Sequence, residues 1–162
     1  MKQDQWQRKR IRIPNFDYAE PQSYFITICT NERKPVFWEN VVAASSRHTP
    51  YQLSDAGAIV DVAIQQITRK YPWILVDKYC IMPDHIHLIV RICADAAGNA
   101  ISARSISTVI GQMKQWVTKQ IGYAVWQKSF MDRIIRNEQE YLAIWTYIEN
   151  NPMKYALDRS GD

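Results

Sequence analysis

The feature that most constrains the fold is a pair of β-rich segments separated by only two residues. Residues 73–82 and 85–92 are rich in aliphatic and aromatic side chains, and Pro83-Asp84 lies between them. Pro and Asp favour tight turns, and a connection this short joins antiparallel neighbours. The sequence therefore predicts a central antiparallel hairpin.

Regular patterns flank this hairpin on both sides. Residues 23–29 predict an earlier strand, and apolar side chains at helical spacing predict a helix that begins with Asp55 as N-cap and stops at Tyr71-Pro72. After the hairpin we expect a mobile loop over residues 94–104 and an amphipathic helix over 106–121, which Gly122 ends.

The last part of the chain predicts a short strand and one more helix. The strand is expected near residues 123–126. The helix begins near Asn137, and we expect it to end at about Pro152 because proline has no backbone N–H to donate and excludes a helical neighbour.

This order of elements predicts an α+β fold of the ferredoxin-like or RRM-like kind. Such a fold has an antiparallel sheet with helices packed on one face, here followed by a C-terminal helix. The 162 residues fit one domain over 1–162, with residues 1–15 as a basic N-terminal arm, and no linker or internal repeat divides them.

Charge is concentrated in that arm. The chain has 20 Lys and Arg against 16 Asp and Glu, a net charge of +4, which permits a polyanionic partner without requiring one. The arm includes Arg8, Lys9, Arg10 and Arg12, which are placed to lie along phosphates. A solvated tail without a partner is the alternative.

Cysteine usage and hydropathy predict a cytoplasmic protein. The three cysteines form no CxxC pair, and an odd number argues against a disulfide framework. The N-terminus lacks the apolar core of a signal peptide, and no apolar run approaches the ~18 residues of a membrane span. We therefore expect no membrane association.

Two histidines share one face of the second hairpin strand. Strand alternation places His85 and His87 together, with Ile86 and Leu88 on the reverse face. Residues at i and i+2 lie roughly 6–7 Å apart, close enough for both rings to reach one metal ion. A hydrogen-bonded structural pair is the alternative. A zinc site that adds Cys80 and Cys93 is a weaker one, because the spacing matches no known finger or ribbon.

Tyr147 and Asn151 are four residues apart on the predicted last helix and therefore share a face. A tyrosine on a helix is by default a packing residue, and Tyr141 competes with Tyr147 for any chemical role. These two side chains are thus candidates only in combination with the histidines.

Three motifs in order resemble one family. They are MPDHIH at 82–87, WQKSFMD at 126–132 with Ile135-Arg136, and YIENNPMK at 147–154. Together they resemble the REP-associated tyrosine transposases, relatives of the HUH single-tyrosine insertion-sequence transposases. The likeness also takes in YFIT at 24–27 and the basic arm, so it covers nearly the whole chain.

The resemblance implies roles for individual residues. The HUH pair falls on His85 and His87, the nucleophile falls on Tyr147, and Asn151 corresponds to the polar residue that completes the metal site. Tyr141 then returns to packing. Lys114 falls where the family tends to keep a lysine. One departure is Arg133, which follows Asp132 where the family usually has histidine; guanidinium would still suit phosphate there.

The implied activity is cleavage and strand transfer of single-stranded DNA at hairpins formed by palindromic repeats. A divalent ion, Mg²⁺ or Mn²⁺, would polarise the phosphate, and a 5′-phosphotyrosine link would conserve the bond. We expect a bacterial, nucleoid-associated monomer or homodimer. The DNA-binding candidates are Arg8, Lys9, Arg10, Arg12, Lys114, Arg133 and Arg136.

Two other functions fit the same sequence. One is a non-catalytic module of the same fold that binds single-stranded nucleic acid, since ferredoxin-like sheets often recognise RNA. The other is a metal-dependent phosphodiesterase with water as nucleophile.

Overall fold

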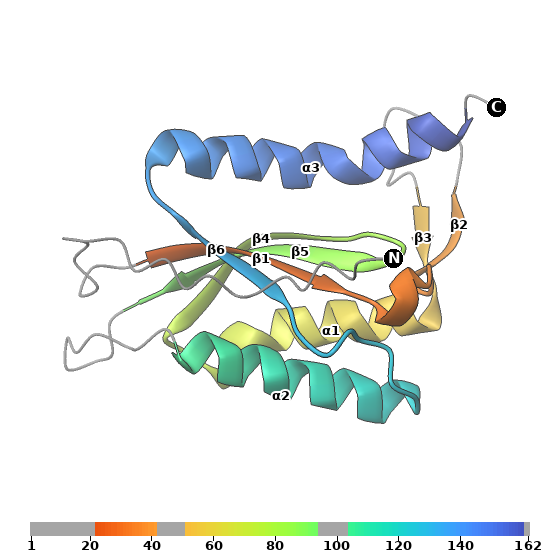
Figure 1. Ribbon diagram of the computed structural model, residues 1–162, viewed down its shortest axis with the longest axis horizontal. Coiled ribbons are helices and arrows are strands. Elements are labelled where there is room, and N and C mark those ends of the chain that lie inside the picture. Colours follow the sequence, from red (N-terminus) through yellow and green to blue (C-terminus); the bar gives the residue numbers. More distant parts are fainter. Residues whose placement is uncertain (1–21, 42–50, 94–103, 161–162) are drawn as a thin grey trace, which may run out of the picture.

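The computed structural model describes residues 22–41, 51–93 and 104–160 and has an α+β fold built on one main antiparallel sheet (Figure 1). The four strands of this sheet are β1 (Gln22–Cys29), β4 (Ile74–Ile81), β5 (His85–Ile92) and β6 (Met131–Ile135). The three α-helices are α1 (Asp55–Lys70), α2 (Arg104–Ile121) and α3 (Glu138–Ser160). A 3₁₀ turn, η1 (Asn31–Arg33), follows β1, and a separate small hairpin consists of β2 (Trp38–Val41) and β3 (Tyr51–Leu53).

The main sheet has the ferredoxin-like topology that the sequence predicts. Its spatial order is β4-β5-β1-β6, and every neighbouring pair is antiparallel. Along the chain the elements run β1-α1-β4-β5-α2-β6, which is the β-α-β-β-α-β arrangement of that fold. The predicted hairpin is thus β4 and β5, and β5 lies at the centre of the sheet.

The helices form two layers on opposite sides of the sheet. In Figure 1, α1 and α2 lie together on one side, and α3 crosses the other. The first layer covers the apolar face of β5, where Ile86, Leu88 and Val90 are almost fully buried. α3 contacts β4 and β5 on the reverse face and buries Ile144 and Ile148 there. The histidine face of β5 is therefore the face that α3 covers.

The N-cap of α1 is Ser54, so the prediction of Asp55 was wrong by one residue. The hydroxyl of Ser54 accepts a hydrogen bond from the backbone N–H of Gly57, and Asp55 is the first residue of the helix. Both residue types suit a helix start, and an acidic side chain in the first turn interacts favourably with the helix dipole. The sequence alone therefore did not decide which of the two residues is the N-cap.

The last helix does not end at Pro152 as predicted, because α3 continues through it to Ser160. Proline loses one helical hydrogen bond, but packing on both sides of it compensates. Pro152 and Ala156 are buried, and the ring of Tyr155 packs edge-on against Trp38 with centroids 5.2 Å apart. Tertiary contacts therefore override the local penalty.

The fourth strand of the sheet is β6, which the sequence did not predict. The prediction of a short strand near residues 123–126 was wrong, because the structure has there one isolated bridge, between Thr30 and Trp126. Three of the five residues of β6 are exposed, so its alternation of apolar and polar residues is weak. The β2–β3 hairpin was also missed, because its strands are only four and three residues long.

Other expectations fall on parts of the chain that the structure does not describe. The basic arm, with Arg8, Lys9, Arg10 and Arg12, and the loop residues 94–103 lie outside the described residues. Within the described ranges, none of the helices is long and apolar enough to cross a bilayer.

Candidate functional site

His85 and His87 lie side by side on β5 and point their Nε2 atoms at each other. The two Nε2 atoms are 3.1 Å apart, and the ring centroids are 4.6 Å apart. His87 is buried and His85 is partly exposed, so the pair opens to solvent on the His85 side. The predicted pair therefore forms, with both imidazoles on one face.

Each imidazole is oriented by a second side chain at its Nδ1 atom. Nδ1 of His85 is 2.6 Å from a carboxylate oxygen of Asp84, and Nδ1 of His87 is 2.9 Å from the hydroxyl of Thr27. Thr27 is the register partner of His87 on β1, so the sheet itself brings this hydroxyl into place. Partners of this kind fix the ring orientation and the tautomer of metal-binding histidines.

The electrostatics keep both rings neutral at neutral pH. Burial, together with the charges of His85 and Arg33, lowers the pKa of His87 to about 3. Burial also lowers the pKa of His85, although Asp84 opposes this shift. Neutral imidazoles have the free lone pairs that a metal ion needs.

Asp84 fixes which nitrogen of His85 carries the proton. Burial would raise the pKa of Asp84, but the hydrogen bond and charge of His85, together with Arg33, lower it. An ionised carboxylate only accepts hydrogen bonds, so Nδ1 of His85 donates and its Nε2 has a lone pair. This lone pair faces Nε2 of His87.

The ring of Tyr147 packs against the histidine pair. Its centroid is 5.4 Å from the centroid of His87 and 6.3 Å from that of Phe25, which itself stacks on His87 at 5.1 Å. The side chain is about half exposed and makes no hydrogen bond to the described part of the chain. α3 therefore brings a solvent-accessible phenol beside two neutral imidazoles.

Polar contacts at β4 hold α3 in this position. The hydroxyl of Tyr141 donates a 2.9 Å hydrogen bond to Asp77, which also pairs with Arg91 at 2.9 Å. Lys78 pairs with Glu149 of α3 at 3.4 Å. Tyr141, the rival candidate for nucleophile, thus has a structural contact next to the β4 bulge.

Asn151 lies on α3 one turn beyond Tyr147 and is partly buried. The structure records no hydrogen bond between Asn151 and either histidine. Within the described ranges, no group of three or more His, Cys, Asp or Glu is placed to hold a metal ion. The zinc alternative finds no support, since Cys80 lies opposite His87 whereas Cys93 follows the far end of β5.

The three DNA-binding candidates that the structure describes lie in different surroundings. Arg133 lies on β6 opposite Phe25, is mostly exposed and pairs with Glu140 at 3.2 Å. Arg136 is exposed just after β6. Lys114, on α2, donates to the backbone carbonyl of Gln127 at 2.7 Å, so it holds the segment before β6. Arg133 is thus the candidate adjacent to the Phe25–His87–Tyr147 cluster.

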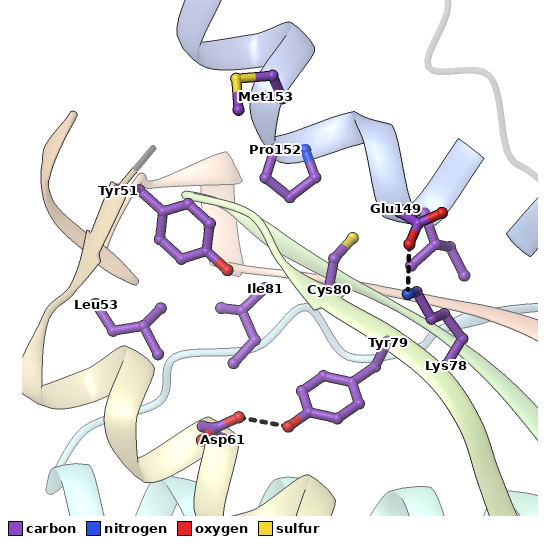
Figure 2. Close-up of a pocket in the computed structure, with 11 residues that line it drawn as sticks. Tyr51, Leu53, Asp61, Lys78, Tyr79, Cys80, Ile81, Glu149, Pro152 and Met153 are labelled. Atoms are coloured by element: carbon purple, nitrogen blue, oxygen red, sulfur yellow. Dashed lines mark hydrogen bonds and ion pairs between the residues drawn. The ribbon is translucent and has the colours of Figure 1, made fainter. Parts of the chain in front are cut away.

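A cavity of about 520 Å³ lies between α3 and the edge strand β4 (Figure 2). The charged groups that line it are paired with neighbours, because Lys78 contacts Glu149 and the hydroxyl of Tyr79 donates to Asp61 at 2.7 Å. Burial raises the pKa of the Cys80 thiol in its wall to about 12, so this thiol stays protonated. The cavity therefore offers little charge to a ligand.

Sequence reasoning missed the residues that orient the histidines. Asp84 was interpreted as part of a turn and as a member of the MPDHIH motif, without a role toward His85, although its position directly before His85 was a usable signal. Thr27 and Phe25 are about 60 residues from His87 in sequence, and only the β1–β5 register brings them together. Both lie in the YFIT segment at 24–27 that the family resemblance takes in, but the sequence assigned them no role beside His87.

Comparison with known proteins agrees with the motifs. A family model described as "Transposase IS200 like" matches residues 20–151. An uncharacterized protein of Haemophilus influenzae is 28% identical over an alignment 171 residues long. The alignment covers 94% of this chain and 92% of the relative. Another protein of that organism, described as "Putative REP-associated tyrosine transposase", is 25% identical over 148 residues, 86% of this chain and 75% of the relative.

A solved structure shares the fold. It is a REP-associated tyrosine transposase bound to a REP hairpin, with a TM-score of 0.57 and 20% identity, and the match covers 83% of this chain and 68% of that chain. The family model spans β1, the histidine strand and α3 as far as Asn151. This protein therefore belongs to the family of IS200-like transposases and has a transposase-like role.

Proposed function

We propose that this protein cleaves and rejoins single-stranded DNA at palindromic hairpins through a 5′-phosphotyrosine on Tyr147, with Mg²⁺ or Mn²⁺ bound by His85 and His87. The observation that carries the proposal is the contact between Tyr147 and His87, at 5.4 Å between ring centroids. It brings a nucleophile and two neutral imidazoles together from elements about 60 residues apart.

The donor set fits a divalent ion. Two ligands at right angles on an octahedral ion, each roughly 2.1 Å from it, have donor atoms ~3.0 Å apart, and the two Nε2 atoms are 3.1 Å apart. Asn151 would add an amide oxygen, and DNA phosphate oxygens would complete the shell. The bound ion would polarise the scissile phosphate and stabilise the leaving oxygen.

Tyr147 performs the covalent step. Its phenolic oxygen attacks phosphorus and loses its proton, the bond from phosphorus to the 3′-oxygen breaks, and that oxygen leaves as a 3′-hydroxyl after gaining a proton. The new ester joins Tyr147 to the 5′-phosphate and conserves the energy of the broken bond, so a 3′-hydroxyl can reverse the reaction. Half-exposure of the ring leaves room for DNA to approach.

The open part of the sheet supports a path for the DNA. α3 lies over β4 and β5, whereas on β6 Met131 and Arg133 are both exposed. Register partners share a face, and the partners of these two residues are Thr27 and Phe25, so both lie on the histidine face. We propose that Arg133 and Arg136 contact phosphates there, with Lys114 and the arm residues Arg8, Lys9, Arg10 and Arg12 extending the surface.

Hairpin DNA is the proposed partner because a related solved structure contains a REP hairpin. The histidines, Tyr147 and the residues that orient them belong to one chain and meet in one sheet and helix layer. A monomer therefore suffices for the chemistry, and a homodimer is not required for it.

The decisive test is a covalent-adduct assay. The protein is incubated with Mg²⁺ or Mn²⁺ and a pool of 3′-labelled hairpin oligonucleotides with randomised single-stranded flanks, and denaturing gels detect label attached to protein. We expect an adduct with the wild type, none with Tyr147→Phe, and none with His85→Ala. Tyr123→Phe is the matched control because Tyr123 is equally exposed but lies just after α2.

Each rival function has its own outcome in this assay. A binding-only module would shift the oligonucleotides on native gels but yield neither product nor adduct. A phosphodiesterase with water as nucleophile would cleave equally well as Tyr147→Phe and form no adduct. Either result would overturn the proposal.

A further inference from the structure

Arg33 lies in an unusual turn next to the histidine pair and takes no part in the proposed chemistry. It ends the short turn η1, and its Nε atom lies 2.9 Å from one carboxylate oxygen of Asp84. The other oxygen of Asp84 is 2.6 Å from Nδ1 of His85. The carboxylate of Asp84 thus connects Arg33 to the imidazole of His85.

The backbone of this turn is strained. Glu32 and Arg33 both have positive φ values, 53° and 56°, and they are the only such non-glycine residues in the described ranges. Side chains with a Cβ rarely adopt this left-handed conformation, and two in succession are rarer still. Strain persists where surrounding contacts enforce it, and it is concentrated at functional sites.

Several contacts enforce the turn and connect it to the loop before β5. Thr30 donates to the carbonyl of Asp84 from its backbone N–H at 2.9 Å and from its hydroxyl at 3.0 Å. The hydroxyl also lies 2.9 Å from the carbonyl of Lys34, and the N–H of Asn31 donates to Val125 at 2.8 Å. The turn and Asp84 therefore form one rigid unit.

A second contact fixes the direction of the guanidinium group. Its Nη1 atom lies 2.8 Å from Sγ of Cys29, the register partner of His85 on β1. The guanidinium is therefore held from β1 and from the hairpin turn together. With Arg33 removed, Asp84 would keep His85 as its one described side-chain partner and could rotate with it.

From this geometry we infer that Arg33 is a positioning residue, which acts through Asp84 to hold Nε2 of His85 toward the metal. The inference rests on the proposed metal site. The strained turn fixes the carboxylate of Asp84, which has two side-chain partners. Arg33 itself does not contact the reacting atoms. Outer-shell partners of metal-binding histidines typically change metal affinity about 10–100-fold.

The test measures binding of Mn²⁺ alone to the intact protein, by the electron paramagnetic resonance signal of free Mn²⁺. We expect Arg33→Gly to weaken binding about tenfold. Glycine suits the left-handed backbone, so this variant should unfold at the same denaturant concentration as the wild type or a higher one. Lys34→Ala is the matched control, because Lys34 lies next to Arg33 and its ammonium group pairs, among the described residues, only with the exposed Glu32.

A double-mutant cycle separates action through Asp84 from direct action. If Arg33 works through this carboxylate, Arg33→Gly adds little to the loss caused by Asp84→Ala. Arg33→Lys should recover part of the affinity because it restores a cation beside Asp84. Additive losses in the cycle, or wild-type affinity in Arg33→Gly, would overturn the inference.

The same titration tells this inference apart from the proposed function. If His85→Ala abolishes Mn²⁺ binding and Arg33→Gly leaves it unchanged, the metal site stands and only the role of Arg33 is wrong. If His85→Ala leaves Mn²⁺ binding unchanged, the proposed metal site is wrong, and so is the role of Arg33.

Discussion

The hydroxyl of Thr27 lies 2.9 Å from Nδ1 of His87, across the β1–β5 ladder in which the two residues are register partners. Thr27 is almost fully buried, so its hydroxyl is held in place by the sheet. If this hydroxyl accepts a hydrogen bond from Nδ1–H, Nε2 of His87 is left with a lone pair, like Nε2 of His85. Two such lone pairs at 3.1 Å repel each other until a cation lies between them.

Thr27→Val should therefore weaken metal binding without disrupting the sheet. Valine matches threonine in shape and in strand preference but cannot accept a hydrogen bond from Nδ1–H of His87. We expect Mn²⁺ affinity to fall about 10–100-fold, and Thr27→Ser to keep most of it. Titration with Mn²⁺ measures both variants, and an unchanged affinity in Thr27→Val would show that the hydroxyl does not orient the ring.

Stability of the metal-free protein should decrease with acidification. The pKa of His87 is about 3 in the folded protein and ~6.5 in the unfolded chain. Between these values the unfolded state binds more protons, so the free energy of unfolding falls as pH falls from ~6.5 to ~3, by up to about 1.4 kcal/mol per pH unit. Urea denaturation at several pH values in metal-free buffer measures this slope.

The control for this slope is His87→Gln, which removes the titrating ring and keeps a polar side chain. Its pH dependence should be flatter than that of the wild type over the same window. Equal slopes for the two proteins would mean that His87 is not held in its neutral form by the fold.

Tyr141→Phe should loosen α3 without removing the nucleophile. Burial, together with the hydrogen bond to Asp77 and its charge, raises the pKa of Tyr141 to about 12. Loss of this partly exposed hydrogen bond should cost about 1 kcal/mol of stability. The variant should still form the covalent DNA adduct, and its ultraviolet titration should lack one tyrosine that ionises at high pH. Loss of the adduct would instead favour Tyr141 as nucleophile.

Two helical glycines should respond in opposite ways to alanine. A Cβ at Gly57 would overlap the backbone carbonyl oxygen of Phe37, whereas a Cβ at Gly111 would meet no heavy atom within 4 Å. Gly57→Ala should therefore destabilise by about 1–3 kcal/mol, and Gly111→Ala should stabilise α2 by about 0.5–1 kcal/mol. Urea midpoints compare the two, and similar shifts would contradict the close approach of α1 to Phe37.

Local patterns predicted most of the fold correctly. The two β-rich segments on either side of Pro83-Asp84 predicted the β4–β5 hairpin, and helical periodicity predicted α1 and α2. Predictions failed where tertiary contacts outweigh local preference. α3 continues through Pro152 because its buried residues pack on both sides, and β6 lacks a clear pattern because three of its five residues are exposed.

The sequence by itself determined which side chains share a strand face or a helix face, since backbone periodicity alone fixes this. It placed His85 beside His87, and Tyr147 one turn from Asn151. Only the tertiary structure decided that Tyr147 meets His87, that Thr27 and Asp84 orient the rings, and that Lys114 holds a loop. These contacts depend on strand register and on the packing of α3 across the sheet, which bring together residues far apart in the chain and leave no periodic signal in the sequence.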